Sequence, residues 1–189
     1  MKPYLVHYYD CQWLQKHDEE ILETLGRTAK VVDETTGRKQ AVFDTKMFRQ
    51  EGDFIISNGE NRLHLCLSTD EVVQVPEGVK SIALGAFNEV FCPNAKHIIL
   101  SSTVDGVSPH AIISHKVEEL TVNNKYIFIS EDAILSCSSL RMIHHIPGGA
   151  TIYVKPDKRM EVHHAQCEAI APSDSNVCSD SFDKNGLPF

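Results

Sequence analysis

The pattern of apolar and polar positions recurs along residues 54–154 with a period of 22 to 25 residues. The clearest copy is residues 73–87, followed by weaker copies at 98–112 and 120–134 and a truncated copy at 146–154. The equivalent apolar positions are Val75, Leu100, Val122 and Ile146; Ile82, Val107, Ile129 and Tyr153; and Ala86, Ala111 and Ala133. A single unit cannot bury its apolar face, whereas stacked units can, so the period predicts a solenoid of short strands.

Alternation within the strands predicts a solvent-facing surface. Side chains of a strand point alternately to opposite faces, so inward Val75, Leu100 and Val122 imply an outward row beside them. The predicted partner-binding residues are Gln74, Ile99, Thr121 and one of His144 and His145, with His97 and Glu119 in a second column. Ile99 is either the apolar centre of a contact surface, or is covered by the N-terminal unit or the tail.

The first 52 residues lack the repeat and predict a small β-α-β-β unit. Its elements are a strand at 4–9, a helix at 12–25 with Asp10 as N-cap and Gly26 as its end, and strands at 29–33 and 40–44. The helix carries an apolar face that includes Leu14, Ile21 and Leu25. Its polar residues, expected on the other faces, are His17, Asp18, Glu19, Glu20 and Glu23.

Short flanking segments complete the expected organisation. Strands at 54–56 and 63–66 surround a turn at 57–60, while Pro156 ends the last strand and residues 157–167 favour a short helix. We therefore expect an α/β or β-rich chain with three parts. These are an N-terminal α/β cap unit (1–52), a solenoid (53–155) and a C-terminal cap or tail (156–189).

The repeat resembles that of the BspA-type leucine-rich-repeat family. Its units read approximately Leu-x-x-Ile-x-Ile-Pro-x-x-Val-x-x-Ile-Gly-x-x-Ala-Phe-x-x-Cys, which residues 75–79, Ile82, Ala86 and Phe87 match, as do residues 133–140. The middle copy carries His115 where the family often has Cys. The resemblance covers about half of the chain and implies a leucine-rich-repeat solenoid that binds other proteins.

The composition of the chain limits the kinds of partner and the cellular compartment that we expect. The chain has 26 acidic and 18 basic residues, a net charge of −8, which disfavours nonspecific binding to nucleic acid. No apolar run is long enough to span a membrane, and the N-terminus lacks the apolar region of a secretory signal. Six scattered cysteines are then expected to be reduced, and we expect a cytoplasmic protein. Three of them are expected to fill the core, namely Cys66, Cys92 and Cys137.

Catalytic and cofactor motifs are absent from the sequence, which contains no phosphate-binding glycine loop and no HExxH or CxxC zinc pattern. Weak metal candidates are His163, His164, Cys167 and Cys178, the first three on the expected helix at 157–167. Cys11 near His7 and His17 is a weaker nucleophile candidate. We therefore expect no cofactor and no catalytic residues.

Three functions are left open by the sequence. The leading one is a non-enzymatic protein-interaction module that uses the strand face of the solenoid. The second is a small acidic inhibitor whose N-terminal unit binds a basic surface of its target, and the third is a metal-dependent enzyme built on the His/Cys-containing tail. Neither the identity of the protein partner nor the oligomeric state follows from the sequence.

Overall fold

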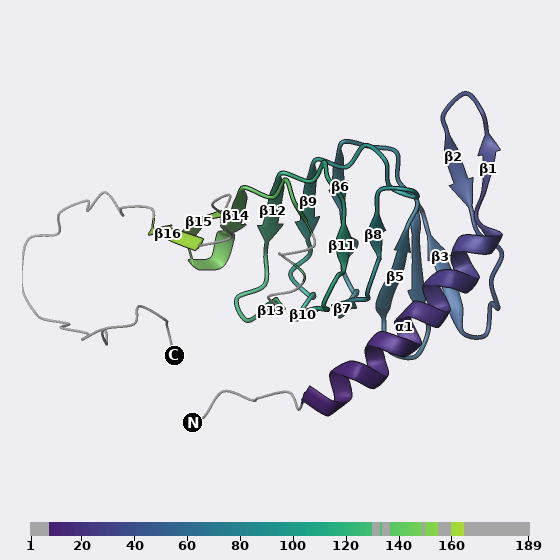
Figure 1. The fold of residues 1–189 in the computed structure, drawn as a ribbon, viewed down its shortest axis with the longest axis horizontal. Coiled ribbons are helices and arrows are strands. Elements are labelled where there is room, and N and C mark those ends of the chain that lie inside the picture. Colours follow the sequence, from purple (N-terminus) through teal and green to yellow (C-terminus); the bar gives the residue numbers. More distant parts are fainter. Residues whose placement is uncertain (1–7, 130–132, 134–136, 149, 155–159, 165–189) are drawn as a thin grey trace, which may run out of the picture.

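The computed structural model describes residues 8–129, 133, 137–148, 150–154 and 160–164. It shows a β-rich chain in which short parallel strands stack into a solenoid-like body of about three turns, with one long helix beside its N-terminal end (Figure 1). The solenoid predicted from the repeat is therefore present.

Each turn of the solenoid contributes a short strand to each of three sides. The first turn holds β7 (Ser81–Ile82), β8 (Phe87–Asn88) and β9 (His97–Leu100), and the second holds β10 (Gly106–Val107), β11 (Ile112–Ile113) and β12 (Glu119–Val122). The third holds β13 (Phe128–Ile129), a bridge between Ser114 and Cys137, and β14 (Met142–His145). Equivalent strands of successive turns pair in parallel, and β5 (Arg62–Cys66) and β6 (Val72–Gln74) precede the first turn.

The strand register confirms the period over the first three copies. Leu100 pairs with Val122, and Val107 pairs with both Ile82 and Ile129. The positions assigned to the fourth copy are wrong. Val122 pairs with His145 rather than with Ile146, which lies in a 3₁₀ turn (Ile146–Gly148), and Tyr153 pairs antiparallel with Met142.

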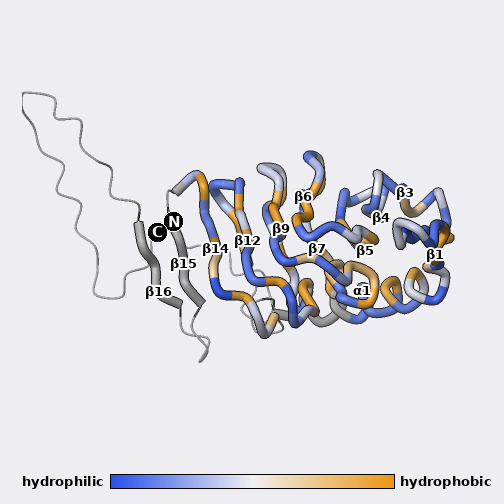
Figure 2. The backbone as a smooth tube through the Cα atoms, turned by 90° about the horizontal axis from the view of Figure 1, so that it is seen from above, coloured by the Kyte–Doolittle hydropathy of each residue, from blue (hydrophilic) through white to orange (hydrophobic). Residues whose placement is uncertain are grey.

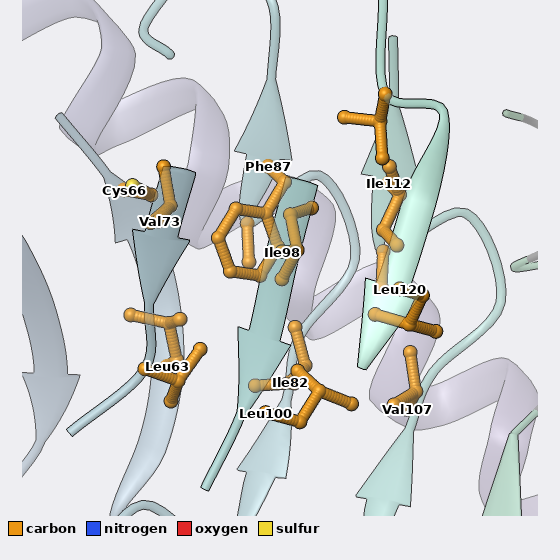
Figure 3. Close-up of a cluster of buried hydrophobic side chains, with 14 of the residues drawn as sticks. Leu63, Cys66, Val73, Ile82, Phe87, Ile98, Leu100, Val107, Ile112 and Leu120 are labelled. Carbon is orange, nitrogen blue, oxygen red and sulfur yellow. The ribbon is translucent and has the colours of Figure 1, made fainter. Parts of the chain in front are cut away.

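The solenoid interior is filled by columns of apolar side chains contributed once per turn. The residues labelled in Figure 3 converge between the strands, and all of them are at most 3% exposed. The small residues Ala86, Ala111 and Ala133 are buried with them. Cys66, Cys92 and Cys137 are also buried, which confirms their predicted role as core residues.

Three antiparallel strands extend one side of the solenoid at its N-terminal end. They are β3 (Phe48–Glu51), β4 (Phe54–Ser57) and β5, and together with β7, β10 and β13 they form a six-stranded sheet. The hairpin of β4 and β5 was predicted, but β3 was missed because its residues are mostly polar and lie at the sheet edge. One sheet thus spans residues 52 and 53, where the sequence suggested a boundary.

Helix α1 (Tyr8–Thr28) packs against β5 and forms a second, smaller core with it. This core includes Leu25, Phe48, Ile55 and Leu65, with Leu22 and Phe91 packed at its edge. Every residue of β5 is buried, because the strand has the solenoid interior on one side and α1 on the other.

The predicted ends of this helix were wrong. Tyr8 and Tyr9 are helical instead of extended, so Asp10 lies inside the first turn and is not the N-cap. Residues 1–7 lie outside the described part of the chain. The helix also continues past Gly26 to Thr28. A Cβ on Gly26 would lie 3.0 Å from the ring of Phe91, so this glycine permits close packing rather than ending the helix.

Two strand pairs lie outside the solenoid. The predicted hairpin after α1 is present as β1 (Lys30–Asp33) and β2 (Arg38–Gln40), but the second strand was expected at 40–44, and residues 41–44 are not in a strand. At the other end, β15 (Ala150–Val154) and β16 (Met160–His164) extend the β14 sheet antiparallel. Only four residues separate β14 from β15, which suits a hairpin and not another parallel turn. Residues 160–164 are thus a strand, and the helix expected there is wrong.

We predict that Gly85→Ala lowers the free energy of unfolding by about 2–4 kcal/mol, because its backbone is left-handed (φ 67°) and a Cβ would overlap the Leu22 side chain of α1. Gly78→Ala is the matched control, since Gly78 also has positive φ but no neighbour within 4 Å of an added Cβ. Urea unfolding measures both. If the two substitutions cost the same, or if Leu22→Ala fails to reduce the Gly85→Ala penalty, the helix contact is not the cause.

Candidate functional site

Two rows of side chains cross strands β6, β9, β12 and β14, which lie side by side in the view of Figure 2. Register pairing places four residues in each row. We name these residues the strand face; they are Gln74, Ile99, Thr121 and His144 in one row, and Val72, His97, Glu119 and Met142 in the other. The alternating burial of β9 and β12 shows that these rows point away from the core.

The structure brings the predicted surface residues together. Of the histidine pair, His144 joins the row of Ile99, while His145 pairs with Val122 and shares a hydrogen bond between its Nε2 and the Asn124 carbonyl oxygen (3.0 Å). Sequence reasoning missed Val72 and Met142, although alternation from His97 through its register partners would have found both.

Polar side chains on the strand face are linked across strands. His97 Nε2 lies 2.8 Å from the Thr121 hydroxyl, and His144 Nε2 lies 3.5 Å from a Glu119 carboxylate oxygen. The His97 and His144 rings meet edge to face, with centroids 6.5 Å apart. These contacts hold the side chains in fixed positions, while Ile99 and Met142 remain half-buried among them.

A line of alternating charges borders the strand face. The residues just before the four strands are Glu71, Lys96, Glu118 and Arg141, and all four are exposed. Lys96 forms an ion pair with Glu71 at 2.8 Å, and the pKa of Lys96 is raised, chiefly by its hydrogen bond to Glu71. The strand face therefore has half-buried apolar residues at its centre and a charged rim, as many protein interfaces do.

A second cluster of interest lies where α1 meets β5. Asp18 of α1 and Arg62 of β5 form a buried ion pair, with Nη2 to Oδ2 at 2.6 Å and Nε to Oδ1 at 3.3 Å. Arg62 also donates to the hydroxyls of Ser81 and Ser108, and the Leu84 backbone N–H donates to Asp18. The pair therefore connects the helix to residues of two successive turns of the solenoid.

His64 lies next to this ion pair and is 4% exposed. Its Nδ1 is 3.9 Å from Asp18 Oδ1, and its ring meets Phe48 edge to face. The pKa of His64 is lowered to about 4, chiefly by burial and also by Arg62 and His17, against the opposing effect of the Asp18 carboxylate. The imidazole is therefore neutral at neutral pH.

Sequence reasoning did not identify the cluster, and its placement of Asp18 on an outer face of the helix was wrong, since Asp18 is 2% exposed. The available signal was its position in the apolar stripe, four residues after Leu14 and three before Ile21. A carboxylate at such a position needs a buried partner.

Several of the remaining candidates lie outside the described residues. His163 and His164 belong to β16, so they are not on the expected helix, and Cys167 and Cys178 lie outside the described residues. His7 is also outside them, and Cys11 and His17 are six residues apart on α1, a spacing that does not share one helical face. Within the described part of the chain, no group of three or more His, Cys, Asp or Glu residues is arranged to hold a metal ion.

Comparison with known proteins adds no family assignment. No family model matches the chain, and neither the curated proteins nor the solved structures contain a significant match. Among the described residues, no helix is both long enough and apolar enough to cross a membrane.

We predict that Asp18→Ala lowers the free energy of unfolding by about 3–5 kcal/mol, because Arg62 is left buried without its counter-charge. Glu23→Ala is the matched control: it removes an exposed acid–Arg pair from the same helix and should cost no more than about 0.5 kcal/mol. Urea unfolding compares the two, with Asp18→Leu/Arg62→Met as a third variant that should lose less than Asp18→Ala. Equal losses for Asp18→Ala and Glu23→Ala would contradict the role of the buried pair.

We also predict that His64 makes the fold sensitive to acid. Its folded-state pKa of about 4 lies below the ordinary 6.5, so between these values the unfolded chain binds the proton and the folded chain does not. The contribution is therefore complete above pH 6.5 and is lost as the pH falls to 4, by about 3 kcal/mol in total. Urea unfolding at several pH values should show a weaker loss in His64→Phe than in the unsubstituted protein. His115→Phe, which changes an exposed histidine, should keep the full loss; an unchanged pH profile in His64→Phe would contradict the assignment.

Proposed function

We propose that this chain is a non-enzymatic protein-binding module that contacts its partner through the strand face. The observation that carries the proposal is the alignment of two side-chain rows in register across four parallel strands. Such a surface is broad and is held by backbone pairing and by side-chain contacts, so little conformational freedom is lost when a partner binds.

The composition of the strand face supports a protein partner. Ile99 and Met142 offer apolar area at the centre, His97, Thr121 and Glu119 offer hydrogen-bonding groups, and charges of both signs form the rim. Mixed apolar and polar surfaces of this kind are typical of protein interfaces. The acidic net charge of −8 argues against a nucleic-acid backbone as the partner.

We further propose that the solenoid is a short leucine-rich-repeat array of the BspA type, with α1 and the β1–β2 hairpin as its N-terminal cap. The proposal is supported by the 22- to 25-residue period and by the matching Ala-Phe and Ala-Ile positions of the repeats. The packing of α1 over β5 supports the cap, because an open solenoid end would expose apolar residues such as Leu65.

A second candidate surface lies on the N-terminal unit. Val31 and Val32 of β1 are 52% and 57% exposed, and Val42 is 72% exposed. The acidic residues Glu19, Glu20 and Glu23 are exposed on α1. This arrangement favours the alternative in which the N-terminal unit binds a basic surface of a target protein.

We predict that replacing the register pair Gln74 and Ile99 with Asp weakens partner binding by roughly five- to thirtyfold, because it places two charges at the centre of the strand face. The matched control replaces Asn88 and Ile113, which also form a register pair between parallel strands but on another side of the solenoid. Both double variants are first shown to be folded by circular dichroism. Binding is then measured by quantitative affinity capture, at increasing salt concentration, of the protein that co-purifies with the unsubstituted chain from its native host.

Retained binding in the Gln74/Ile99 variant would contradict the strand face as the contact surface. In that case a steep loss of binding with salt indicates the exposed acidic residues of α1 instead, because charge-driven contacts are screened and apolar ones are not.

A further inference from the structure

A cavity of about 250 Å³ lies between α1, β3 and the β4–β5 hairpin, on a different part of the molecule from the strand face. Its apolar wall is formed by Ile21, Met47 and Phe48, and its polar wall by Asp18, Arg62 and His64. The polar residues are each at most 6% exposed, so a ligand in this cavity would meet them largely shielded from bulk water.

The unusual feature of the cavity is the His64 side chain. No hydrogen bond joins its ring to any of the described residues, and its nearest charged neighbour, Asp18 Oδ1, is 3.9 Å from Nδ1. No fully buried nitrogen or oxygen atom of a described side chain lacks a hydrogen-bond partner, so the ring nitrogens of His64 are open to the cavity that the ring lines and are available to a ligand there.

The backbone at His64 supports the same conclusion. Ile55 and Ile56 are consecutive in β4, but their partners in β5 are Leu65 and Leu63, so the residue between these two partners has no partner in β4. His64 is the extra residue of a β-bulge. Bulges change the direction of a side chain and are frequent beside functional sites, and this one lies at the residue that lines the cavity.

The carboxylates and the permanent cations around the cavity balance. Asp18 and Arg62 neutralise each other, Lys46 and Glu60 carry opposite charges at the mouth, and the other titratable groups of the lining are the His17 and His64 rings. A ligand with a net charge would gain no excess of counter-charge here while losing its hydration. The cavity therefore suits an uncharged ligand.

Hydrogen-bonding capacity is available for such a ligand. Arg62 uses four of its five N–H groups on Asp18, Ser81 and Ser108, which leaves one donor on Nη1. A neutral His64 ring supplies one acceptor and one donor. Since Arg62 and His64 both line the cavity, a ligand that carries both a donor and an acceptor can use both residues.

The volume sets the size of the ligand. A cavity of roughly 150 Å³ accommodates benzene. The 250 Å³ found here holds a ring with one or two polar substituents, against the flat side chains of Phe48 and His64.

We propose that this cavity is a binding site for a small, uncharged ring compound of the cyclic amide class, which carries a hydrogen-bond donor beside an acceptor. The amide N–H donates to the His64 ring, the amide oxygen accepts from Arg62, and the carbon atoms of the ring lie against Ile21, Met47 and Phe48. The site is independent of the strand face.

The test uses the full chain and four probes of similar size: 2-pyridone, benzene, benzoate and benzamidine. Binding is followed by ligand-observed and amide chemical-shift NMR titration. We expect 2-pyridone to bind with shifts centred on β5 and α1, and each of the other three to bind about tenfold more weakly or not at all. Failure of 2-pyridone to bind would overturn the proposal, as would equal or tighter binding of benzoate, benzamidine or benzene.

Two variants locate the site. His64→Phe keeps a ring beside Phe48 but removes the nitrogens, and it should weaken 2-pyridone binding by about tenfold. Met47→Trp adds volume from a side chain that is 52% exposed, so it should fill the cavity without disturbing the core, and should abolish binding. Unchanged binding in a folded Met47→Trp protein would place the ligand elsewhere. Unchanged binding in His64→Phe would remove the recognition by His64.

Discussion

The buried ion pair between Asp18 and Arg62 is the interaction on which the N-terminal half of the structure depends. Removing two charges from water is costly, and here the cost is offset by a nearly complete set of hydrogen bonds to both groups. Arg62 reaches Ser81 of one solenoid turn and Ser108 of the next. The helix is thus fixed in one position relative to the stacked strands. Apolar packing alone would define this position less narrowly.

The position of β5 explains why such an anchor is needed. This strand separates two cores, with Leu63 and Cys66 facing the solenoid interior and Leu65 facing the helix. A slip of one residue moves every side chain of a strand to the opposite face. Where both faces are apolar, such a slip costs little, so the register has to be fixed in another way. Arg62, at the start of β5, and the bulge at His64 both fix the register here.

The repeating part of the chain was predictable because the same apolar positions are buried in every turn. Ile82, Val107 and Ile129 occupy equivalent places in successive turns, and the period can be counted directly in the sequence. The end of the array was not predictable from the same pattern. Ile146 and Tyr153 continue the spacing, yet the short connection after His145 turns the chain back as a hairpin.

The candidate sites divide in the same way. Strand alternation placed His97, Ile99 and Thr121 on one surface, because neighbouring strands repeat the same local geometry. The Asp18–Arg62–His64 cluster joins residues 44 positions apart in the chain through the docking of a helix, which no local pattern records. Only the presence of a carboxylate within the apolar stripe of α1 indicated that a buried cationic partner existed.

The strand face and the cavity beside His64 differ in how regular their geometry is, and this difference determines which ligands suit them. Strand-face side chains rest on columns of buried residues such as Ile98, Leu120 and Ile143, so their spacing is set by backbone pairing. A surface with that regularity suits an extended partner that makes several equivalent contacts. The cavity beside His64 is instead assembled from a helix, an edge strand and a bulged strand, each with its own geometry. Because no repeat imposes its shape, its residues are free to specify one small ligand, and the His64 imidazole, which lines the cavity, is the group most directly placed to do so.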